Sequence, residues 1–347
     1  MAFENLSERE KQVLYNLITH YIGSADPVGS RVIANRFRMG LSSATIRNTL
    51  QDLEELGLVE QPHASAGRIP TDLGYRVYVD FLLKPDQLTR AEKEAIRDAV
   101  LREGRGVDAI LGQTSKVLGE ITQELGVSIG PRFDEGVLKR LDLIPITSER
   151  IMVVVVVRSG LARSVIIEIE AAISESSLGE VEAVLNERLA GLTLGEIRRT
   201  IGSRLADVPK GGRLVKLLLD SDNKIWTDLA PDAVRIAGVD HLLQQPEFSD
   251  MGKISELVKI LENGRLLSDF LKDAQDAGLV IVIGSENKYA DIMKCSLVAS
   301  SYRIGKITGA IGIIGPTRMP YSKLVSVVEH TAKTITEVLS GYDSDKD

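Results

Sequence analysis

The sequence has 347 residues and a formal net charge of −7, with 44% apolar, 26% charged and 4% aromatic residues. This length predicts two or three domains, and the balance of apolar and charged residues is typical of a globular protein. The balance therefore excludes a chain that is disordered throughout. The acidic tail at 342–347 is the exception, and we expect it to be disordered.

Several other classes of protein are disfavoured by the same inspection. The longest apolar run, at 151–157, is far shorter than the ~20 residues of a membrane-spanning helix. The first residues lack the charge order and apolar middle of a signal peptide, so we expect a cytoplasmic protein with no membrane partner. The single cysteine, Cys295, excludes an internal disulfide and a Cys-based zinc site, and the four histidines are scattered. We expect neither a metal nor a cofactor.

The first 86 residues predict a winged helix-turn-helix domain. Apolar periodicity predicts helices at 6–22 and 30–37, and a third that begins at Ser42 or Ser43 and ends at Gly57. Two short extended segments around a loop at 61–68 predict a β-wing. Thr71 is placed to cap a further helix at 72–83.

Positive charge is concentrated in the parts of this domain that would face DNA. Residues 27–51 hold four arginines and no acidic residue, and the loop at 61–71 holds one arginine and no acidic residue. Residues 1–85 as a whole carry nine basic and ten acidic side chains. Neither of these two segments therefore carries a carboxylate, although the domain as a whole is nearly neutral. Such a distribution favours contact with phosphates.

The residue types on the third helix suit the reading of base edges. Because the apolar residues of this helix face the core, its polar residues face solvent or the flanks: Thr45, Arg47, Asn48 and Gln51. Arginine pairs bidentately with guanine, and Asn or Gln with adenine, in the major groove. Ser42, Ser43 and the backbone N–H groups at the helix start suit a phosphate.

Further candidate DNA contacts lie on the second helix and the wing: Arg31, Arg36, His63, Ser65 and Arg68. Alternative interpretations stay open. Ser43 can be an ordinary helix cap, and the polar side of the third helix can be an ordinary solvated surface. Arg68 can be paired locally, and His63 can be a turn residue with no role.

The rest of the chain predicts an α+β multidomain architecture. A helical stretch at 90–125 is followed by strands at 138–144, 150–158 and 163–170, and then by helices at 177–189, 193–205 and 254–276. Strands return at 278–283, 296–303 and 306–314, before a last helix at 321–339. We expect one α/β domain interrupted by a helical insertion. The expected division is 1–86, a helical connector at 87–136, an α/β domain at 137–172 and 278–341, an insertion at 173–277, and the tail.

Two motifs near the last strand have modest interpretations. Gly309, Gly312 and Gly315 lack the dinucleotide-binding spacing, so close packing of strands is favoured over a nucleotide site. Residues 316–320 form either the wall of a small-molecule pocket or, as we favour, a rigid lead-in to the last helix.

The segment "SSATIRNTLQDLEELGLVEQPHASAGRIPTDLGYRVYVD" at 42–80 resembles the HrcA family of heat-inducible transcription repressors. Three shorter segments support the resemblance in the same order: "LLQQPEF" at 242–248, "IGSEN" at 283–287 and "GAIGIIGPTRMPYSKL" at 309–324. The resemblance implies a winged helix, then a GAF-like α/β domain split by an inserted dimerisation domain. It also implies repression of chaperone operons by a homodimer on an inverted-repeat operator in double-stranded DNA, with dependence on a GroEL-type chaperonin.

A reader of an inverted repeat needs a two-fold axis, and the insertion at 173–277 is the natural place for it. We therefore expect a dimeric repressor without catalytic activity. One alternative is a regulator that senses a small molecule through its GAF-like domain. An enzyme with an appended winged helix, and a winged helix used to bind proteins, are the others, although no nucleophile, base and metal constellation supports the enzyme.

Overall fold

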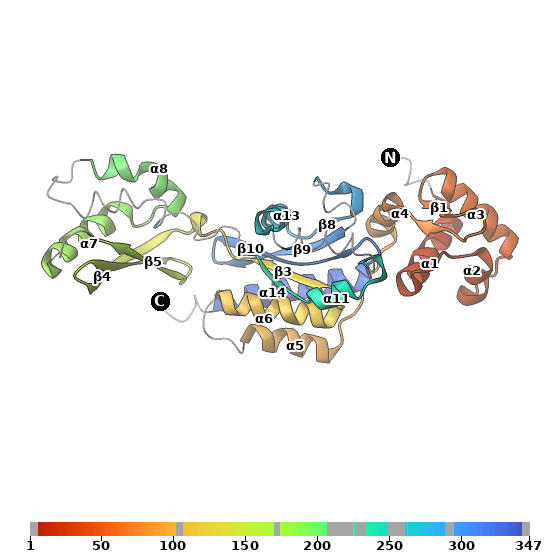
Figure 1. The fold of residues 1–347 in the computed structure, drawn as a ribbon, viewed down its shortest axis with the longest axis horizontal. Helices are drawn as coiled ribbons and strands as arrows, with labels where there is room; N and C mark the ends of the chain where they lie inside the picture. The colour runs from red at the N-terminus through yellow and green to blue at the C-terminus, as the bar shows by residue number, and fades with distance from the viewer. Residues whose placement is uncertain are drawn as a thin grey trace.

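The computed structural model describes residues 6–101, 107–169, 174–206, 225, 234–248, 261, 263–288 and 295–341. Three parts follow one another along the long axis of the molecule: the N-terminal helices, a central sheet with helices on it, and a smaller sheet-and-helix unit (Figure 1). The start of the helix expected at 254–276 and the tail at 342–347 lie outside the described residues.

The N-terminal part is the expected winged helix. Its elements are α1 (Glu8–Ser24), α2 (Ser30–Phe37), α3 (Ser43–Glu55), β1 (Val59–Glu60), β2 (Ile69–Pro70), α4 (Asp72–Val77) and the π-helical turn η2 (Tyr78–Leu82). Ser7 caps α1 through a reciprocal box with Glu10, and Thr71 caps α4. The apolar stripes of the three helices meet in one core, in which Leu17, Ile46 and Leu53 are fully buried.

Two glycines let the backbone of the wing come close to its neighbours. A Cβ on Gly67 would lie 2.4 Å from the carbonyl carbon of Val28, because Val28 and Arg68 exchange two backbone hydrogen bonds. A Cβ on Gly74 would lie 2.0 Å from the carbonyl oxygen of Leu58. Both contacts fix the wing against the helices, since no side chain fits between the two backbones.

The central part is a five-stranded antiparallel sheet in the order β7-β3-β10-β9-β8. Its strands are β3 (Leu125–Ile129), β7 (Arg235–Ala237), β8 (Val280–Val282), β9 (Cys295–Ile304) and β10 (Ile307–Pro316). One face carries α6 (Val107–Thr122) and α14 (Tyr321–Gly341), and the other carries α13 (Gly264–Ala277). The helix α5 (Arg90–Leu101) packs outside α6 and α14. Two short helices, α11 (Val239–Leu243) and η4 (Pro246–Phe248), follow β7, and η5 (Gly284–Glu286) follows β8.

The structure corrects the expected division of the chain at 87–136. The stretch predicted to be one helical connector is two helices, α5 packed outside α6 and α6 on the face of the central sheet, followed by β3 inside that sheet. β3 and the short β7 were not predicted as strands. Both are short, and in β3 all five residues are buried, so neither has the alternation that marks a half-exposed strand.

The second correction concerns the strands expected at 138–170. They form a separate three-stranded sheet, β4 (Leu138–Thr147), β5 (Arg150–Val157) and β6 (Ala162–Glu168), and do not join the central sheet. α7 (Glu175–Leu189) and α8 (Leu194–Arg204) pack on one face of this sheet in a core of their own. The inserted unit therefore begins earlier than expected, close to η3 (Phe133–Glu135), and is a sheet with helices rather than a helical unit. Period-two patterns identify strands but do not tell which sheet a strand joins.

The glycine spacing of β10 serves close packing, as expected. A Cβ on Gly309 would lie 2.2 Å from the Tyr302 ring, and a Cβ on Gly312 would lie 2.7 Å from Ala299. Tyr302 is fully buried and donates a hydrogen bond to the carbonyl of Ile129 at 2.9 Å. The absence of a side chain at Gly309 makes room for this tyrosine, and the absence of one at Gly312 lets β10 pack closely against Ala299 of β9.

The substitution Gly74→Ala tests the close contact between α4 and the wing. We expect it to lower the free energy of unfolding by about 1–3 kcal/mol, because the new methyl group collides with backbone that cannot rotate away. Urea unfolding followed by circular dichroism measures this. The control is Gly112→Ala in α6, where a Cβ meets nothing within 4 Å and an alanine gains up to about 1 kcal/mol of helix stability. Equal stability of the two variants would contradict the account.

Candidate nucleic-acid interface

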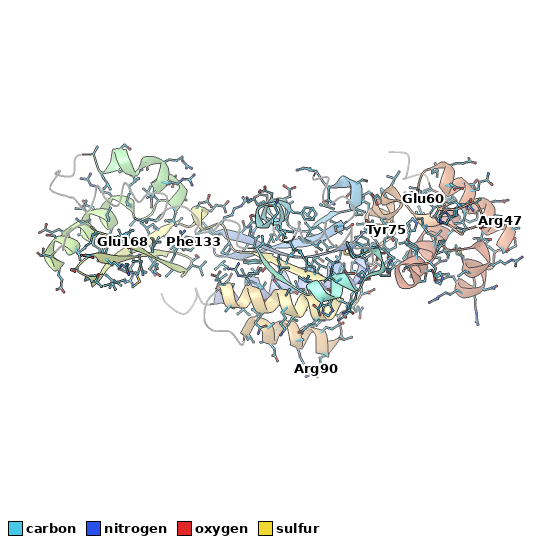
Figure 2. All side chains as sticks on the ribbon, in the orientation of Figure 1. Arg47, Glu60, Tyr75, Arg90, Phe133 and Glu168 are labelled. Atoms are coloured by element: carbon cyan, nitrogen blue, oxygen red, sulfur yellow. The ribbon has the colours of Figure 1, made fainter. Side chains whose placement is uncertain are left out.

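The helix α3 presents its polar side chains to solvent, as the sequence predicts. Arg47, Asn48 and Gln51 are exposed, whereas Ile46 and Leu53 on the opposite side are fully buried. Arg47 lies at the outer end of the molecule, far from the unit at the other end that carries Glu168 (Figure 2). Thr45 is only partly exposed. Three long polar side chains therefore extend from one helix that a major groove can receive.

The start of α3 is capped by Ser42. Its hydroxyl accepts a hydrogen bond from the backbone N–H of Thr45 at 3.0 Å and lies 2.9 Å from the Thr45 hydroxyl. Ser42 is thus the N-cap, and Ser43 is the first residue of the helix. Ser42 stays exposed, so this end of the helix remains accessible to an anion.

Unpaired positive charge surrounds α3. The side chains of Arg31, Arg36, Arg38 and Arg47 are exposed, and none forms an ion pair with another described residue. Arg38 has a left-handed backbone conformation (φ 44°) at the end of α2, in the turn that leads to α3. This surface can approach phosphates without first breaking salt bridges.

The wing divides the remaining candidates into two groups. His63 and Ser65 are exposed in the loop, which Gln61 holds by donating hydrogen bonds to the carbonyls of Ala64 and Ala66. Arg68 instead pairs with Glu54 at 2.7 Å, and its side chain is only 20% exposed. The structure therefore favours the alternative in which Arg68 is paired locally and fixes the wing to the last turn of α3.

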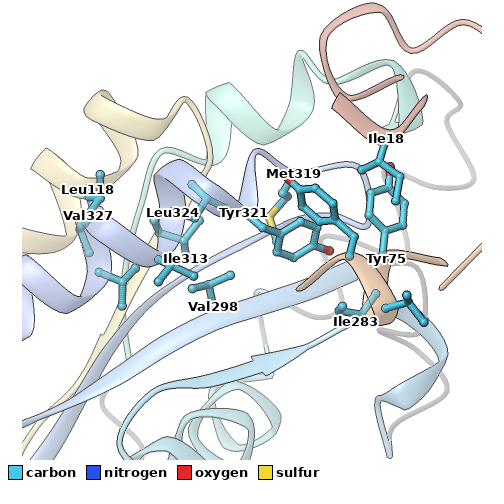
Figure 3. Close-up of a cluster of buried hydrophobic side chains, with 14 of the residues drawn as sticks. Ile18, Tyr75, Leu118, Ile283, Val298, Ile313, Met319, Tyr321, Leu324 and Val327 are labelled. Atoms are coloured by element: carbon cyan, nitrogen blue, oxygen red, sulfur yellow. The ribbon is translucent and has the colours of Figure 1, made fainter. Parts of the chain in front are cut away.

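Sequence reasoning missed a buried contact between the winged helix and the central part. Tyr75 of α4 packs against Tyr321 of α14 with ring centroids 5.8 Å apart, and both side chains are buried (Figure 3). Apolar side chains continue from Ile18 of α1 to Ile283 of the central part without a break. The winged helix and the helical face of the central sheet thus share one core.

Polar groups surround this buried contact. Arg76 pairs with Glu286 at 2.5 Å and donates to the carbonyl of Ile281 at 2.7 Å, and Asp72 accepts from the backbone N–H of Ser285 at 2.8 Å. Burial alone raises the pKa of the Glu286 carboxyl, but the hydrogen bonds from Arg76 and Ile283 hold it below its usual value. The ion pair is therefore fully charged at neutral pH.

Arg318 supplies the contact on the other side of Tyr75. It pairs with Glu247 at 2.6 Å and donates to the carbonyl of Ile22, in the last turn of α1, at 2.6 Å. Its side chain is 12% exposed. The segments 242–248, 283–287 and 309–324 thus meet at the junction with the winged helix. The resemblance of these three segments to one family was the one sequence signal of this junction.

Two family models match the chain. "Winged helix-turn-helix transcription repressor, HrcA DNA-binding" matches residues 5–79, and "HrcA protein C terminal domain" matches residues 108–325. A likeness to a solved structure supports the fold alone: a crystal structure described as that of a hypothetical protein is 22% identical with a TM-score of 0.63, covering 97% of this chain and 99% of the other.

Curated relatives match over nearly their whole length. A heat-inducible transcription repressor HrcA of Chlorobium phaeobacteroides is 39% identical over 98% of this chain and 100% of its own. The repressor of the same name of Pelotomaculum thermopropionicum is 36% identical over 96% of this chain and 97% of its own. No helix in the described part of the chain is long and apolar enough to cross a membrane. With its winged helix at one end and these matches along its length, the chain belongs to the HrcA family of heat-inducible transcription repressors.

Proposed function

We propose that this protein is a non-catalytic, dimeric repressor of heat-shock chaperone operons that binds an inverted-repeat operator in the cytoplasm. The observation that carries the proposal is the exposed set Arg47, Asn48 and Gln51 on a helix surrounded by unpaired arginines. In this mechanism each α3 enters a major groove and reads base edges, and bound dimers block the promoter.

The proposed DNA contacts fall into three classes. Arg47, Asn48 and Gln51, with Thr45 beside them, read bases, because their side chains carry the matching donors and acceptors. Ser42, Ser43, Arg31 and Arg36 hold phosphates on either side. His63 and Ser65 in the wing lie along the adjacent backbone or minor groove. Arg68 contributes indirectly by fixing the wing, since its guanidinium is occupied by Glu54.

The inserted unit supplies a surface for the second copy. One face of its sheet carries apolar side chains that the described residues leave exposed, among them Ile144 (42%), Ile146 (47%) and Ile166 (57%). Ile144, Met152 and Ile166 lie opposite one another on the three strands and form one row across the sheet. An exposed apolar row of this kind is typical of an interface between copies.

Dependence on a GroEL-type chaperonin also belongs to this proposal. The inserted unit has a hydrophobic core separate from the core shared by the winged helix and the central part. Chains with several cores expose apolar surface when one part folds late, and such chains aggregate without assistance.

The first prediction concerns base reading. We expect Arg47→Ala to weaken operator binding by about 1–3 kcal/mol and to relax specificity at one base pair, because a bidentate contact is lost. Arg36→Ala should weaken all sequences alike and lower the salt slope by about one unit. Fluorescence anisotropy with operator and scrambled duplexes measures both. Arg90→Ala, at an exposed arginine of α5 outside the winged helix, is the control. Unchanged operator affinity in Arg47→Ala would support the protein-interaction alternative instead.

The second prediction concerns dimerisation. Ile166→Glu places a charge at the β6 end of the apolar row, at its most exposed member (57%), and we expect it to weaken self-association by about tenfold or more, since a charge buried at an apolar interface has no partner. Equilibrium sedimentation measures the dissociation constant. Leu101→Glu replaces a similarly exposed residue of α5 (49%) and should leave the dimer intact. A dimer that persists unchanged in Ile166→Glu would exclude this face.

The third prediction concerns heat. After a brief heat pulse, operator binding should recover when chaperonin and ATP are present and should stay low without them, because refolding competes with aggregation. Band-shift titration before and after the pulse measures the active fraction. Full recovery without chaperonin would contradict this part of the proposal.

A further inference from the structure

A buried carboxyl group lies at the junction between α6 and β3, beside the contact with the winged helix. Glu124 is 3% exposed, and its Oε2 has no hydrogen-bond partner among the described residues. Its Oε1 lies 3.5 Å from the amide nitrogen of Gln245. Burial raises the pKa of Glu124 to about 8, although Arg318 acts in the opposite direction. The carboxyl group is therefore protonated at neutral pH.

Gln245 connects this carboxyl group to Arg318. The amide oxygen of Gln245 accepts a hydrogen bond from Arg318 Nη2 at 3.1 Å, and Arg318 Nη1 donates to the carbonyl of Ile22 at 2.6 Å. Ile22 lies in the last turn of α1, where unpaired carbonyl groups favour a cation. One side chain, Gln245, thus separates Glu124 from the guanidinium that contacts the winged helix.

We propose that Arg318 is a positioning residue that holds the winged helix in the orientation that reads the operator, and that Glu124 controls this contact through Gln245. While Glu124 is neutral, Arg318 stays with Glu247 and the carbonyl of Ile22. When Glu124 ionises, its carboxylate competes for the guanidinium and draws it away from α1. This inference rests on the proposed function, because its consequence is a change in operator affinity.

Several elements that pack near Glu124 carry titratable or charged side chains. Arg318 precedes α14 and Glu247 lies in η4, and these two charges act on Glu124 directly. Tyr21 of α1 and Tyr75 of α4 face the same two charges, and burial raises the pKa of each tyrosine above 10. The backbone of Gly238 lies between Glu124 and His241 of α11: a Cβ on Gly238 would lie 2.7 Å from the carbonyl oxygen of Glu124 and 3.2 Å from the His241 ring. The Arg318–Glu247 pair is therefore the charged pair that ionised Glu124 confronts.

The test follows operator affinity and domain docking against pH in the full-length protein. Fluorescence anisotropy at pH 6.5–9 gives the affinity. Energy transfer between dyes on Arg9→Cys of α1 and Lys306→Cys of the central part gives the docking, with labelled protein diluted in unlabelled protein. Both positions are exposed, and the native Cys295 is buried, so labelling is selective.

We expect the wild-type operator affinity to fall about tenfold between pH 7 and pH 9. Each pH unit above the pKa of Glu124 raises the ratio of ionised to neutral Glu124 tenfold, and only the neutral form keeps Arg318 on α1. Energy transfer should fall over the same range. Glu124→Gln should change by less than about twofold in both readouts. Arg318→Met should bind weakly at every pH and show no step. Glu120→Gln, an exposed carboxylate in the same helix, should follow the wild type.

Stability gives a second measurement. Because Glu124 keeps its proton in the folded state up to about pH 8, burial costs little near pH 4.5, and stability is lost as the pH rises from there to about 8. Glu124→Gln should therefore raise the melting temperature at pH 8 but not near pH 4.5.

Parallel pH profiles of wild type and Glu124→Gln would overturn the proposal. Falling affinity with constant energy transfer would also overturn it, because the pH would then act on the DNA-facing surface. A pH step in energy transfer without operator binding at any pH would support the positioning account and refute the proposed function.

Discussion

Tyr75 and Tyr321 pack against each other across the boundary between the winged helix and the central part. The ion pairs Arg76–Glu286 and Arg318–Glu247 lie on either side of them. This contact joins the apolar core of the winged helix to that of the central sheet. A recognition helix reads a defined half-site only when its orientation relative to the second copy is fixed. The reading of an operator that we propose therefore depends on this buried contact.

The arrangement of the three parts follows from the same requirement. The helix α3, which we propose reads bases, lies at one end of the molecule, and the apolar sheet face of the inserted unit belongs to the other end (Figure 1). The central part connects them. Where the chain leaves the central sheet for the inserted unit, Arg132 pairs with Asp276 of α13 at 2.7 Å and with Glu135 of η3 at 3.4 Å. In the dimer that we propose, a stiff connection would transmit the geometry of the dimer to the two α3 helices, whereas a flexible one would leave their spacing undefined.

The sequence predicted the winged helix almost element by element because its signals are local. Ser7 and Thr71 cap helices that begin at the next residue, and each apolar stripe is set by residues three or four positions apart. The sheets were harder to predict, since the strands of the inserted unit and of the central domain have similar patterns and differ only in their partners. For the candidate site, the exposure of Arg47 and Asn48 followed from helical periodicity. The pairing of Arg68 with Glu54 did not, because the two residues are distant in sequence and meet only after the wing has folded back.

The most direct measurement is a footprint of the purified protein on a duplex that carries a chaperone-operon inverted repeat, compared with a scrambled duplex, across a salt series. We expect protection of both half-sites with two-fold symmetry, together with a steep loss of affinity as salt rises. Equal and weak binding to the two duplexes, even with chaperonin present, would contradict it.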